Sequence, residues 1–331
     1  MKIAIHSNQF DGRGTGKTPY DYGVALRDIL GHEVVYITTH DDPNEGLPRI
    51  GKEFPVFQYN GNANRAPAVD VKRQIEKIVS DQKIDFVQMM KSGANDFINP
   101  ENCKTGTHYI FDGKQPHGDV FAAVSNALAR KFGLTAYVPH IIQRIEPNKD
   151  IRAALNIPKD ALVIGRHGGK ESFDLAFVHR AVEQVLKTRK DVYFLFLSTN
   201  PFINHERAIF FPWVSNETGI FNFINACDIM LHARHMGETF GLSVGEFSVS
   251  NKPVITWSGK MPWSGEINTG YDTAHLDHLG NKALLYDDFN SLVKLIGGLD
   301  VNFIRSQNWD MFTEKFSPKS VITQYKDVFL T

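Results

Sequence analysis

The chain has 331 residues, with 36 Lys and Arg against 37 Asp and Glu and a net charge of −1. Its length predicts about two domains, and its 42% hydrophobic and 22% charged residues exclude a disordered, fibrous or coiled-coil protein. Because the charges balance, no global positive field exists to attract nucleic acid or an anionic membrane. Two cysteines, Cys103 and Cys227, are too few for a disulfide framework or a four-thiolate metal site.

Hydropathy excludes a membrane-spanning helix, since no stretch reaches the ~20 apolar residues that such a helix needs. The first residues have the charge of a signal peptide, but His6 and the polar residues after it interrupt the apolar run. We therefore expect a cytoplasmic protein without an integral membrane segment and without a nucleic-acid partner.

Short apolar runs alternate with amphipathic stretches through the first half of the chain. The predicted strands are residues 2–6, 33–39, 84–90, 107–111 and 120–124. A Gly-rich loop is expected at 11–17, and helices at 22–29, at 67–82 and from 126 to near Gly133. This alternation predicts βαβ crossovers and a mainly parallel sheet with helices on both faces.

The pattern becomes polar and is broken by prolines at 139–160, which we interpret as a linker, and the alternation then restarts. Strands are predicted at 162–165, 192–198, 229–232 and 253–257, and helices at 173–188, 221–226, 240–249, 290–298 and 318–330. We predict an α/β fold of two doubly wound Rossmann-like domains that face one another across a cleft. Their expected bounds are 1–150 and 151–316, with a terminal helix at 317–331 that either crosses back to the first domain or packs on the second. The carboxyl ends of such sheets bind ligands.

The segment Gly14-Thr-Gly16-Lys-Thr is similar to a phosphate-binding loop but incomplete, because the position five residues before Gly16 is Asp11 rather than Gly. A Gly-rich turn before a helix can still offer the amides of Gly14 and Gly16 to a phosphate or a sugar. The alternative is a tight turn that binds nothing.

The stretch from Glu238 to Glu246 is the most informative part of the sequence. On a helix that starts near Phe240 the two carboxylates would lie roughly 12 Å apart, which is comparable to the length of a sugar diphosphate ribose. A carboxylate accepts two hydrogen bonds from a vicinal diol, and the amides of Thr239, Phe240 and Gly241 can face a diphosphate. The alternative is a helix with one capping and one surface glutamate.

Two cations, Arg166 and Lys170, follow the first predicted strand of the second half. At the carboxyl edge of a sheet they could neutralise a diphosphate leaving group, although either alone could be an ordinary surface cation.

Taken together, these segments resemble the donor half of retaining glycosyltransferases of the family-four type, which have the two-domain GT-B fold. The resemblance is carried by Gly165-Arg-x3-Lys170, Asp228-Ile-Met-Leu-His-Ala-Arg234, Gly237-Glu-Thr-Phe-Gly-Leu-x3-Glu246-Phe and Lys252-Pro-Val-Ile255. It is strong over 160–257 and weak over 40–105.

The resemblance implies a role for each matched position. Arg166 and Lys170 would hold the donor diphosphate, and Glu238 would contact the hydroxyls of the donor sugar. The backbone from Thr239 to Leu242 would touch sugar or phosphate, and Glu246 would bind the ribose diol.

The resemblance also implies the reaction and its partners. The enzyme would be a metal-independent transferase of the hexosyltransferase type, with no cofactor besides its substrate, a UDP- or GDP-linked sugar. The acceptor would be a glycan or another hydroxyl compound. A histidine after a strand of the first domain would face the reacting carbon, and His108 and His117 compete for that place. We favour His117, a loop residue, because His108 lies within an apolar run and suits a core position.

Three other functions remain open on the same fold. A sugar-nucleotide epimerase would consume the donor without an acceptor, a phosphorylase would need a lysine for pyridoxal phosphate, and a non-catalytic protein would only bind the sugar nucleotide.

Overall fold

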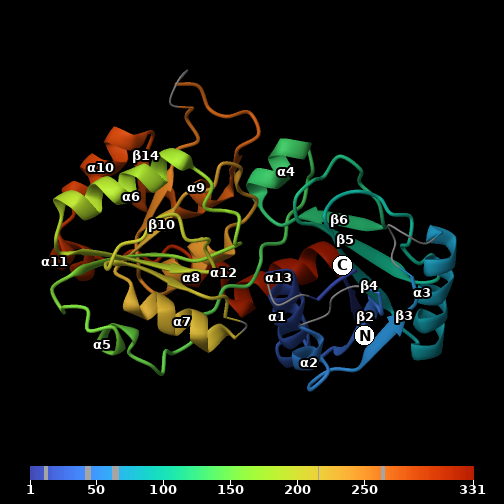
Figure 1. The fold of residues 1–331 in the computed structure, drawn as a ribbon. Helices are drawn as coiled ribbons and strands as arrows, with labels where there is room; N and C mark the ends of the chain where they lie inside the picture. The colour runs from blue at the N-terminus through green and yellow to red at the C-terminus, as the bar shows by residue number, and fades with distance from the viewer. Residues whose placement is uncertain (11–13, 42–45, 62–66, 215, 262–264) are drawn as a thin grey trace. The chain divides into compact units, whose positions relative to one another are not determined.

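The computed structural model describes residues 1–10, 14–41, 46–61, 67–214, 216–261 and 265–331. The chain forms two compact units, of which unit 1 comprises Met1–Ile141 and Lys315–Thr331 and unit 2 comprises Ile142–Glu314. Each unit contains a six-stranded parallel sheet with helices on both faces (Figure 1). The prediction of an α/β chain with two doubly wound Rossmann-like units is confirmed.

The sheet of unit 1 has the strand order β3-β2-β1-β4-β5-β6. Its strands are β1 (Lys2–His6), β2 (Glu33–Thr39), β3 (Val56–Tyr59), β4 (Phe86–Lys91), β5 (Lys104–Tyr109) and β6 (Val120–Ala123). The central strands β1 and β4 are runs of buried residues, as parallel strands covered on both faces require.

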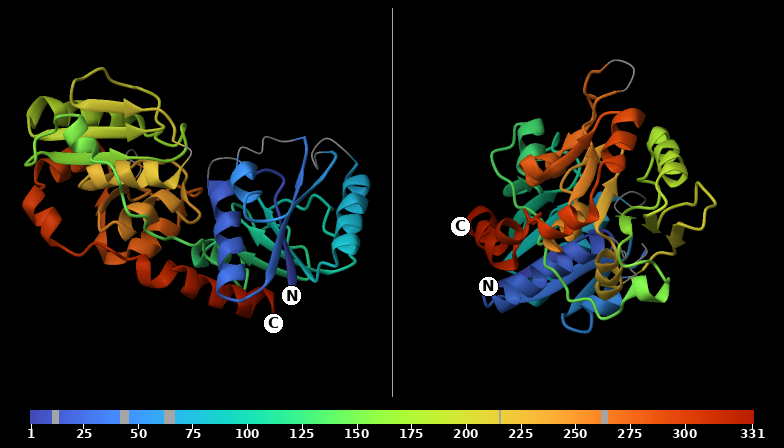
Figure 2. Two further views of the ribbon diagram at one scale, coloured as in Figure 1. Left: turned by 90° about the horizontal axis from the view of Figure 1, so that it is seen from below. Right: turned by 90° about the vertical axis from the view of Figure 1, so that its left-hand side faces the viewer.

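The helices of unit 1 are α1 (Gly14–Asp28), α2 (Leu47–Ile50), α3 (Ala68–Gln82), α4 (Asn126–Phe132) and α13 (Pro318–Phe329). The helices α1 and α3 lie on opposite sides of the sheet (Figure 2), and α13 packs against α1. The rings of Tyr325 and Phe329 are completely buried, and the Tyr325 hydroxyl donates to Gln88 Oε1 at 3.1 Å. The last helix is therefore part of the core of unit 1.

The sheet of unit 2 has the order β14-β12-β10-β7-β8-β9. Its strands are β7 (Leu162–Arg166), β8 (Val192–Leu197), β9 (Ala208–Phe211), β10 (Ile229–His232), β12 (Val254–Trp257) and β14 (Ala283–Tyr286). A separate two-stranded parallel sheet pairs β11 (Gly237–Glu238) with β13 (Asp272–Thr273).

The other helices are α5 (Ile151–Ala154), α6 (Ala176–Thr188), α7 (Glu217–Ala226), α8 (Leu242–Val249), α9 (Ala274–Leu279), the 3₁₀ helix η1 (Gly280–Lys282), α10 (Phe289–Gly297), α11 (Val301–Ser306) and α12 (Thr313–Phe316). The pair α6 and α10 covers one face of the sheet, and α7 with α8 covers the other (Figure 1). Among the described residues, none of the helices has both the length and the apolar character of a membrane span.

Several predicted elements need correction. The strands β3, β9 and β14 were not predicted, and the expected linker contains the short helix α5. The helix α1 already starts at Gly14, so residues 14–17 are not a loop, and residues 11–13 lie outside the described residues. The helix α6 starts at Ala176 rather than 173, and α8 starts at Leu242 rather than near Phe240.

Candidate functional site

The sheet of unit 2 reverses its strand order between β7 and β10, which are neighbours in the sheet. In doubly wound folds, ligands bind at the carboxyl ends of the strands at such a reversal. β7 ends at Arg166 and is followed by His167, and β10 ends at His232 and is followed by Ala233 and Arg234. The fold therefore brings two segments far apart in the sequence to one edge of the sheet.

Glu238 contacts the residues that end β10. Its Oε1 lies 3.2 Å from His232 Nε2, and its Oε2 accepts a hydrogen bond of 2.7 Å from the Arg234 guanidinium. Burial alone would raise the pKa of Glu238, but the hydrogen bonds from His232 and Arg234 and the charge of Arg234 outweigh it and lower the pKa below its ordinary value. Glu238 is therefore an ionised, oriented acceptor.

Glu246 contacts the residue that follows β7. It lies in α8, is 5% exposed, and its Oε2 lies 2.9 Å from His167 Nε2. The His167 ring stacks on Phe247 of the same helix, with centroids 5.8 Å apart. The alternative of a surface glutamate is wrong, because this carboxylate is buried at the same sheet edge as Glu238.

The backbone between the two glutamates turns sharply before α8. Gly241 has φ +93°, and a Cβ there would lie 3.2 Å from the Cβ of His275, so the position requires glycine. The ring of Phe240 is buried against His278 and Phe312, and Phe240 can therefore offer only its main chain to a ligand. Thr239 and Leu242 are half-buried.

This turn corrects the spacing argument. Because the helix begins at Leu242, the rise of a continuous helix does not give the distance from Glu238 to Glu246. The first turn of α8 has no side-chain hydrogen bond from its N-cap residue, Gly241. Its amide groups consequently carry the partial positive charge of an uncapped helix N-terminus.

Arg166 is enclosed by its own loop. Its two terminal nitrogens donate four hydrogen bonds, to Ser198 O, Thr199 Oγ1, Gly169 O and Ser172 Oγ, at 2.6 to 3.0 Å. Burial lowers the pKa of Arg166 to about 10. In this conformation Arg166 holds the loop that follows β7, and its contact with a diphosphate stays a prediction.

Lys170 stands at the exposed end of that loop. Gly168, with φ +148°, gives the loop a backbone conformation that favours glycine. Within the described part of the chain, Lys170 forms no ion pair. Its ammonium group is the cation that this loop leaves open to solvent, and its role also stays a prediction.

The two histidine candidates of unit 1 have different surroundings. His108 is completely buried, with Nε2 2.8 Å from Val138 O and Nδ1 3.2 Å from Gln88 Nε2, and burial lowers its pKa to about 4. It is a core histidine. His117 lies in the loop between β5 and β6, its Nδ1 is 2.7 Å from Gln115 O, and its Nε2 has no hydrogen-bond partner among the described residues.

Gly14 and Gly16 lie in the first turn of α1 rather than in a loop. Lys17 forms an ion pair with Asp21 one helical turn later. Any phosphate or sugar contact of this segment would therefore use the helix N-terminus, which stays a prediction.

Three partners in the site lie within the sequence motifs but received no role: His167, His232 and Arg234. Each follows or ends a strand, and this position was the signal available in the sequence. What the sequence lacked was the knowledge that β7 and β10 are adjacent.

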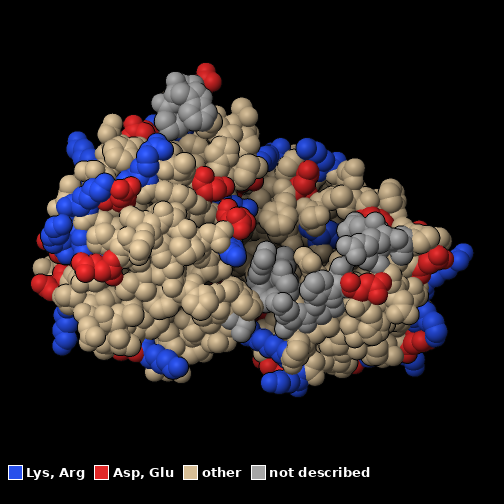
Figure 3. Space-filling model, viewed as in Figure 1, with Lys and Arg blue, Asp and Glu red and all other residues tan. Residues whose placement is uncertain are grey.

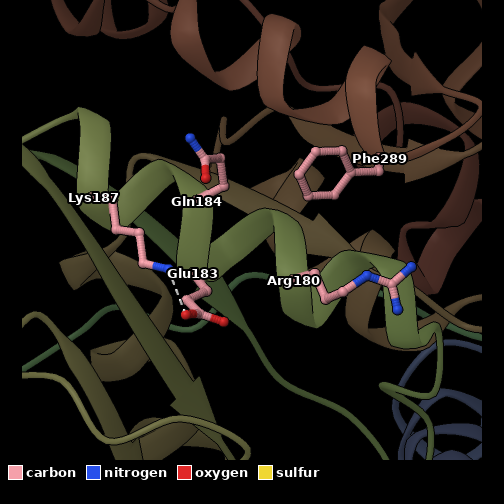
Figure 4. A pocket seen from close by; sticks show the side chains of 5 residues that line it. All are labelled: Arg180, Glu183, Gln184, Lys187 and Phe289. Atoms are coloured by element: carbon pink, nitrogen blue, oxygen red, sulfur yellow. Dashed lines mark hydrogen bonds and ion pairs between the residues drawn. The ribbon is translucent and has the colours of Figure 1, made fainter.

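A surface hollow of about 460 Å³ lies elsewhere in unit 2, on α6 and α10 (Figure 4). It is lined by Arg180, Glu183, Gln184, Lys187 and Phe289. Figure 4 shows Lys187 paired with Glu183, and none of the candidate residues belongs to the hollow.

Acidic and basic side chains are interspersed over the visible face of the chain (Figure 3), in keeping with its net charge of −1. Among the described residues, no group of three or more His, Cys, Asp or Glu is arranged to hold a metal ion.

Comparison with solved structures finds similar folds over the whole chain. HepE from Anabaena, in complex with UDP and glucose, has a TM-score of 0.72 at 14% identity, covering 100% of both chains. A glycosyltransferase from Rickettsia africae ESF-5 has a TM-score of 0.70 at 15% identity, covering 99% of this chain and 94% of that one. A putative UDP-N-acetylglucosamine 2-epimerase from Listeria monocytogenes has a TM-score of 0.60 at 12% identity, covering 99% and 96%.

No protein-family model and no curated protein matches the sequence. The likeness to solved structures therefore shows the fold: this chain has the two-domain Rossmann-like architecture of these proteins.

Proposed function

We propose that this chain is a glycosyltransferase that moves a sugar from a nucleotide-diphosphate sugar to an acceptor hydroxyl. The observation that carries the proposal is the placement of Glu238 and Glu246, two carboxylates that contact the ends of the adjacent strands β10 and β7. The resemblance of the motifs and the glycosyltransferase neighbours support the same conclusion.

The donor would occupy unit 2. Glu238 would accept hydrogen bonds from the sugar hydroxyls, and Glu246 would accept them from the ribose diol. The amides at the start of α8 would face the diphosphate, together with Lys170. The sugar end and the ribose end of the donor differ in polarity and length. With one carboxylate on each side of the helix N-terminus, the donor would bind in a single orientation, with its sugar at Glu238 and its ribose at Glu246.

The chemistry follows from the charges that develop as the anomeric bond breaks. Negative charge grows on the departing phosphate, and fixed amides and a cation stabilise it more in the transition state than in the ground state. We propose transfer of a hexosyl group with retention, in which the acceptor attacks on the face that the phosphate leaves and gives its proton to a phosphate oxygen. Because the helix N-terminus and Lys170 supply the counter-charge, we propose that catalysis needs no metal and no cofactor.

The first test is a thermal-shift screen of the full chain against UDP, GDP, ADP and their sugars. A ligand at 100 times its dissociation constant stabilises the folded state by roughly 2.7 kcal/mol, so a true donor stands out from the other nucleotides. The selected donor is then incubated with hydroxyl acceptors in EDTA, and nucleoside diphosphate release and the anomeric configuration of the product are measured. Absence of stabilisation by every nucleotide sugar would refute the proposal.

A sugar-nucleotide epimerase is the second candidate, because the putative epimerase from Listeria monocytogenes shares the fold. An epimerase converts the donor without any acceptor, so product analysis of the donor incubated alone separates the two. A new sugar epimer formed without acceptor would favour the epimerase.

A further inference from the structure

A buried network of hydrogen-bonded polar side chains lies behind Glu238 in unit 2. His232, whose Nε2 faces Glu238, has its Nδ1 2.9 Å from Thr256 Oγ1 on the neighbouring strand β12. The same hydroxyl lies 3.2 Å from Nε2 of His275, which is completely buried at the start of α9. The rings of His232 and His275 have centroids 4.7 Å apart.

The hydrogen bonds of Tyr271, at the far end of this network, determine where its protons lie. The Tyr271 hydroxyl donates to the carbonyl oxygen of Trp257 at 2.6 Å, so the Tyr271 oxygen can only accept from His275 Nε2, 3.2 Å away. Nε2 of His275 therefore carries a proton. Burial holds the pKa of His275 well below its ordinary value, so the ring is neutral and Nδ1 is bare. In agreement, His275 Nδ1 has no hydrogen-bond partner among the described residues.

Thr256 is the next group of this network. A hydroxyl has one proton to donate and can accept from another group. Because Nε2 of His275 lies 3.2 Å from both hydroxyl oxygens, its single N–H is shared between Tyr271 and Thr256. Thr256 is then an acceptor toward His275, and its own proton is available to His232 Nδ1. A His232 that accepts at Nδ1 is neutral and protonated at Nε2, and this N–H is the group that faces Glu238 Oε1 at 3.2 Å.

We propose that Thr256, His275 and Tyr271 are positioning residues that hold His232 as the neutral Nε2–H tautomer and thereby orient the Glu238 carboxylate toward the donor sugar. This inference rests on the proposed function. A carboxylate has about four lone-pair sites; His232 and Arg234 occupy two, which leaves two for a pair of sugar hydroxyls.

The competing arrangement turns the Thr256 proton toward Tyr271, which is also a hydrogen-bond neighbour of Thr256. His232 would then have to donate from both nitrogens and carry a positive charge. Among the described residues, His232 contacts Glu238 and His275, and its carbonyl oxygen accepts from the Tyr286 hydroxyl. Arg234 pairs with the same Glu238 carboxylate.

The tautomer can be measured directly on the wild-type chain. Histidine-selective ¹⁵N labelling and long-range ¹H–¹⁵N correlation spectra near neutral pH distinguish the two neutral tautomers and the doubly protonated ring, and the His232→Gln variant assigns the signal. We expect His232 as the Nε2–H tautomer. An Nδ1–H tautomer or a doubly protonated His232 overturns the proposal, and the tautomer itself is read from the spectrum of the wild-type chain.

A second experiment compares UDP and UDP-glucose as probes. Thr256→Val removes the hydroxyl at nearly constant shape, and Thr256→Ser is its matched control because it keeps the hydroxyl. We expect Thr256→Val to leave the affinity for UDP unchanged. The ratio of the affinity for UDP-glucose to that for UDP, here called the UDP-glucose advantage, should fall about ten- to a hundredfold, which is the effect of removing a residue that orients a ligand-binding histidine in metal sites. Thr256→Ser should keep the UDP-glucose advantage and the His232 signals of the wild-type chain.

The outcomes separate the two proposals. An unchanged advantage of UDP-glucose in Thr256→Val, or an equal loss of both ligands, overturns the positioning role. A wild-type chain that binds no nucleotide sugar refutes the proposed function instead, while the tautomer measurement still decides the state of His232.

Discussion

Arg166 and Lys170 follow the same strand but have opposite surroundings. The four hydrogen bonds of the Arg166 guanidinium join the loop after β7 to residues 198 and 199, whereas Lys170 is exposed. A cation whose terminal nitrogens donate to protein oxygens stabilises a loop, and a cation in solvent can meet a ligand. The two residues should therefore respond differently to substitution.

Lys170→Ala is expected to lower turnover with the donor roughly 10²- to 10³-fold, the scale for losing one donor to a developing anion, without lowering the melting temperature. Steady-state release of nucleoside diphosphate measures the effect. Lys187→Ala, which removes an exposed lysine from α6 in the same unit, is the matched control and should keep full turnover. Equal turnover of both variants would contradict the role of Lys170.

Arg166→Ala is expected to destabilise unit 2 by about 2–4 kcal/mol, because it removes a buried guanidinium and leaves the buried Thr199 Oγ1 and the partly buried Ser198 O without their donor. Denaturant unfolding measures the change. A variant that keeps wild-type stability but loses turnover would instead assign Arg166 to the donor diphosphate.

The sequence predicted the acidic pair and the strand-end cations of the site, but not their partners. Glu238 and Glu246 stand out because their motif is local. Their contacts with His232 and His167 depend on which strands are adjacent, and this is decided by the packing of the whole sheet. The proton positions in the network behind Glu238 depend on contacts between three further segments, which no local pattern encodes.

Among the secondary-structure elements, the three unpredicted strands of the two six-stranded sheets share one property: β3, β9 and β14 are all at the edge of a sheet. Each has four residues, only one of them buried, so none forms the continuous apolar run that marks a central strand. The inner strands are buried over most of their length and were predicted with errors only in their bounds.

The start of α8 depends on a single glycine. Gly241→Ala places a Cβ at φ +93° and 3.2 Å from that of His275, and we expect it to destabilise unit 2 by about 1–2 kcal/mol or more. Because the turn also aims the first amides of α8, affinity for UDP should fall as well. Thermal unfolding with and without UDP measures both effects.

Gly297→Ala is the control for this substitution. Gly297 ends α10, and an added Cβ there meets no atom within 4 Å. We expect unchanged or slightly increased stability, by up to about 1 kcal/mol, and normal UDP binding. If Gly241→Ala behaved like Gly297→Ala, the backbone turn would not be a requirement of the site.

Over the whole molecule, several histidines are buried without charge. Burial lowers the pKa of His108 to about 4, and burial together with the charge of Lys91 lowers that of His6 to about 3, against an ordinary value of 6.5. Burial also holds the pKa of His275 in unit 2 well below that value. In the unfolded chain these groups take up protons as the pH falls through 6.5, while the folded chain does not.

Acidification should therefore destabilise the fold. The contribution of the neutral histidines to the unfolding free energy is complete above their pKa in the unfolded chain. It is lost as the pH falls toward their pKa in the folded chain, and the loss reaches roughly 2 kcal/mol for each such histidine by about pH 5. Unfolding free energies measured at several pH values check this. His108→Gln should flatten the pH dependence even where it lowers stability overall, and an unaltered slope would contradict the assignment of His108 as a neutral core residue.

The core of unit 1 is built from both ends of the chain, since Tyr325 and Phe329 pack in it beside residues of the first strands and helices. During synthesis, unit 2 is complete in sequence before residue 315 is made, whereas unit 1 lacks part of its interior until the last helix leaves the ribosome. The sheet of unit 1 in the nascent chain therefore lacks the side chains of α13 on one face, while unit 2 can already fold. This order of completion makes the beginning of the chain, rather than its middle, the part that depends on protection during translation.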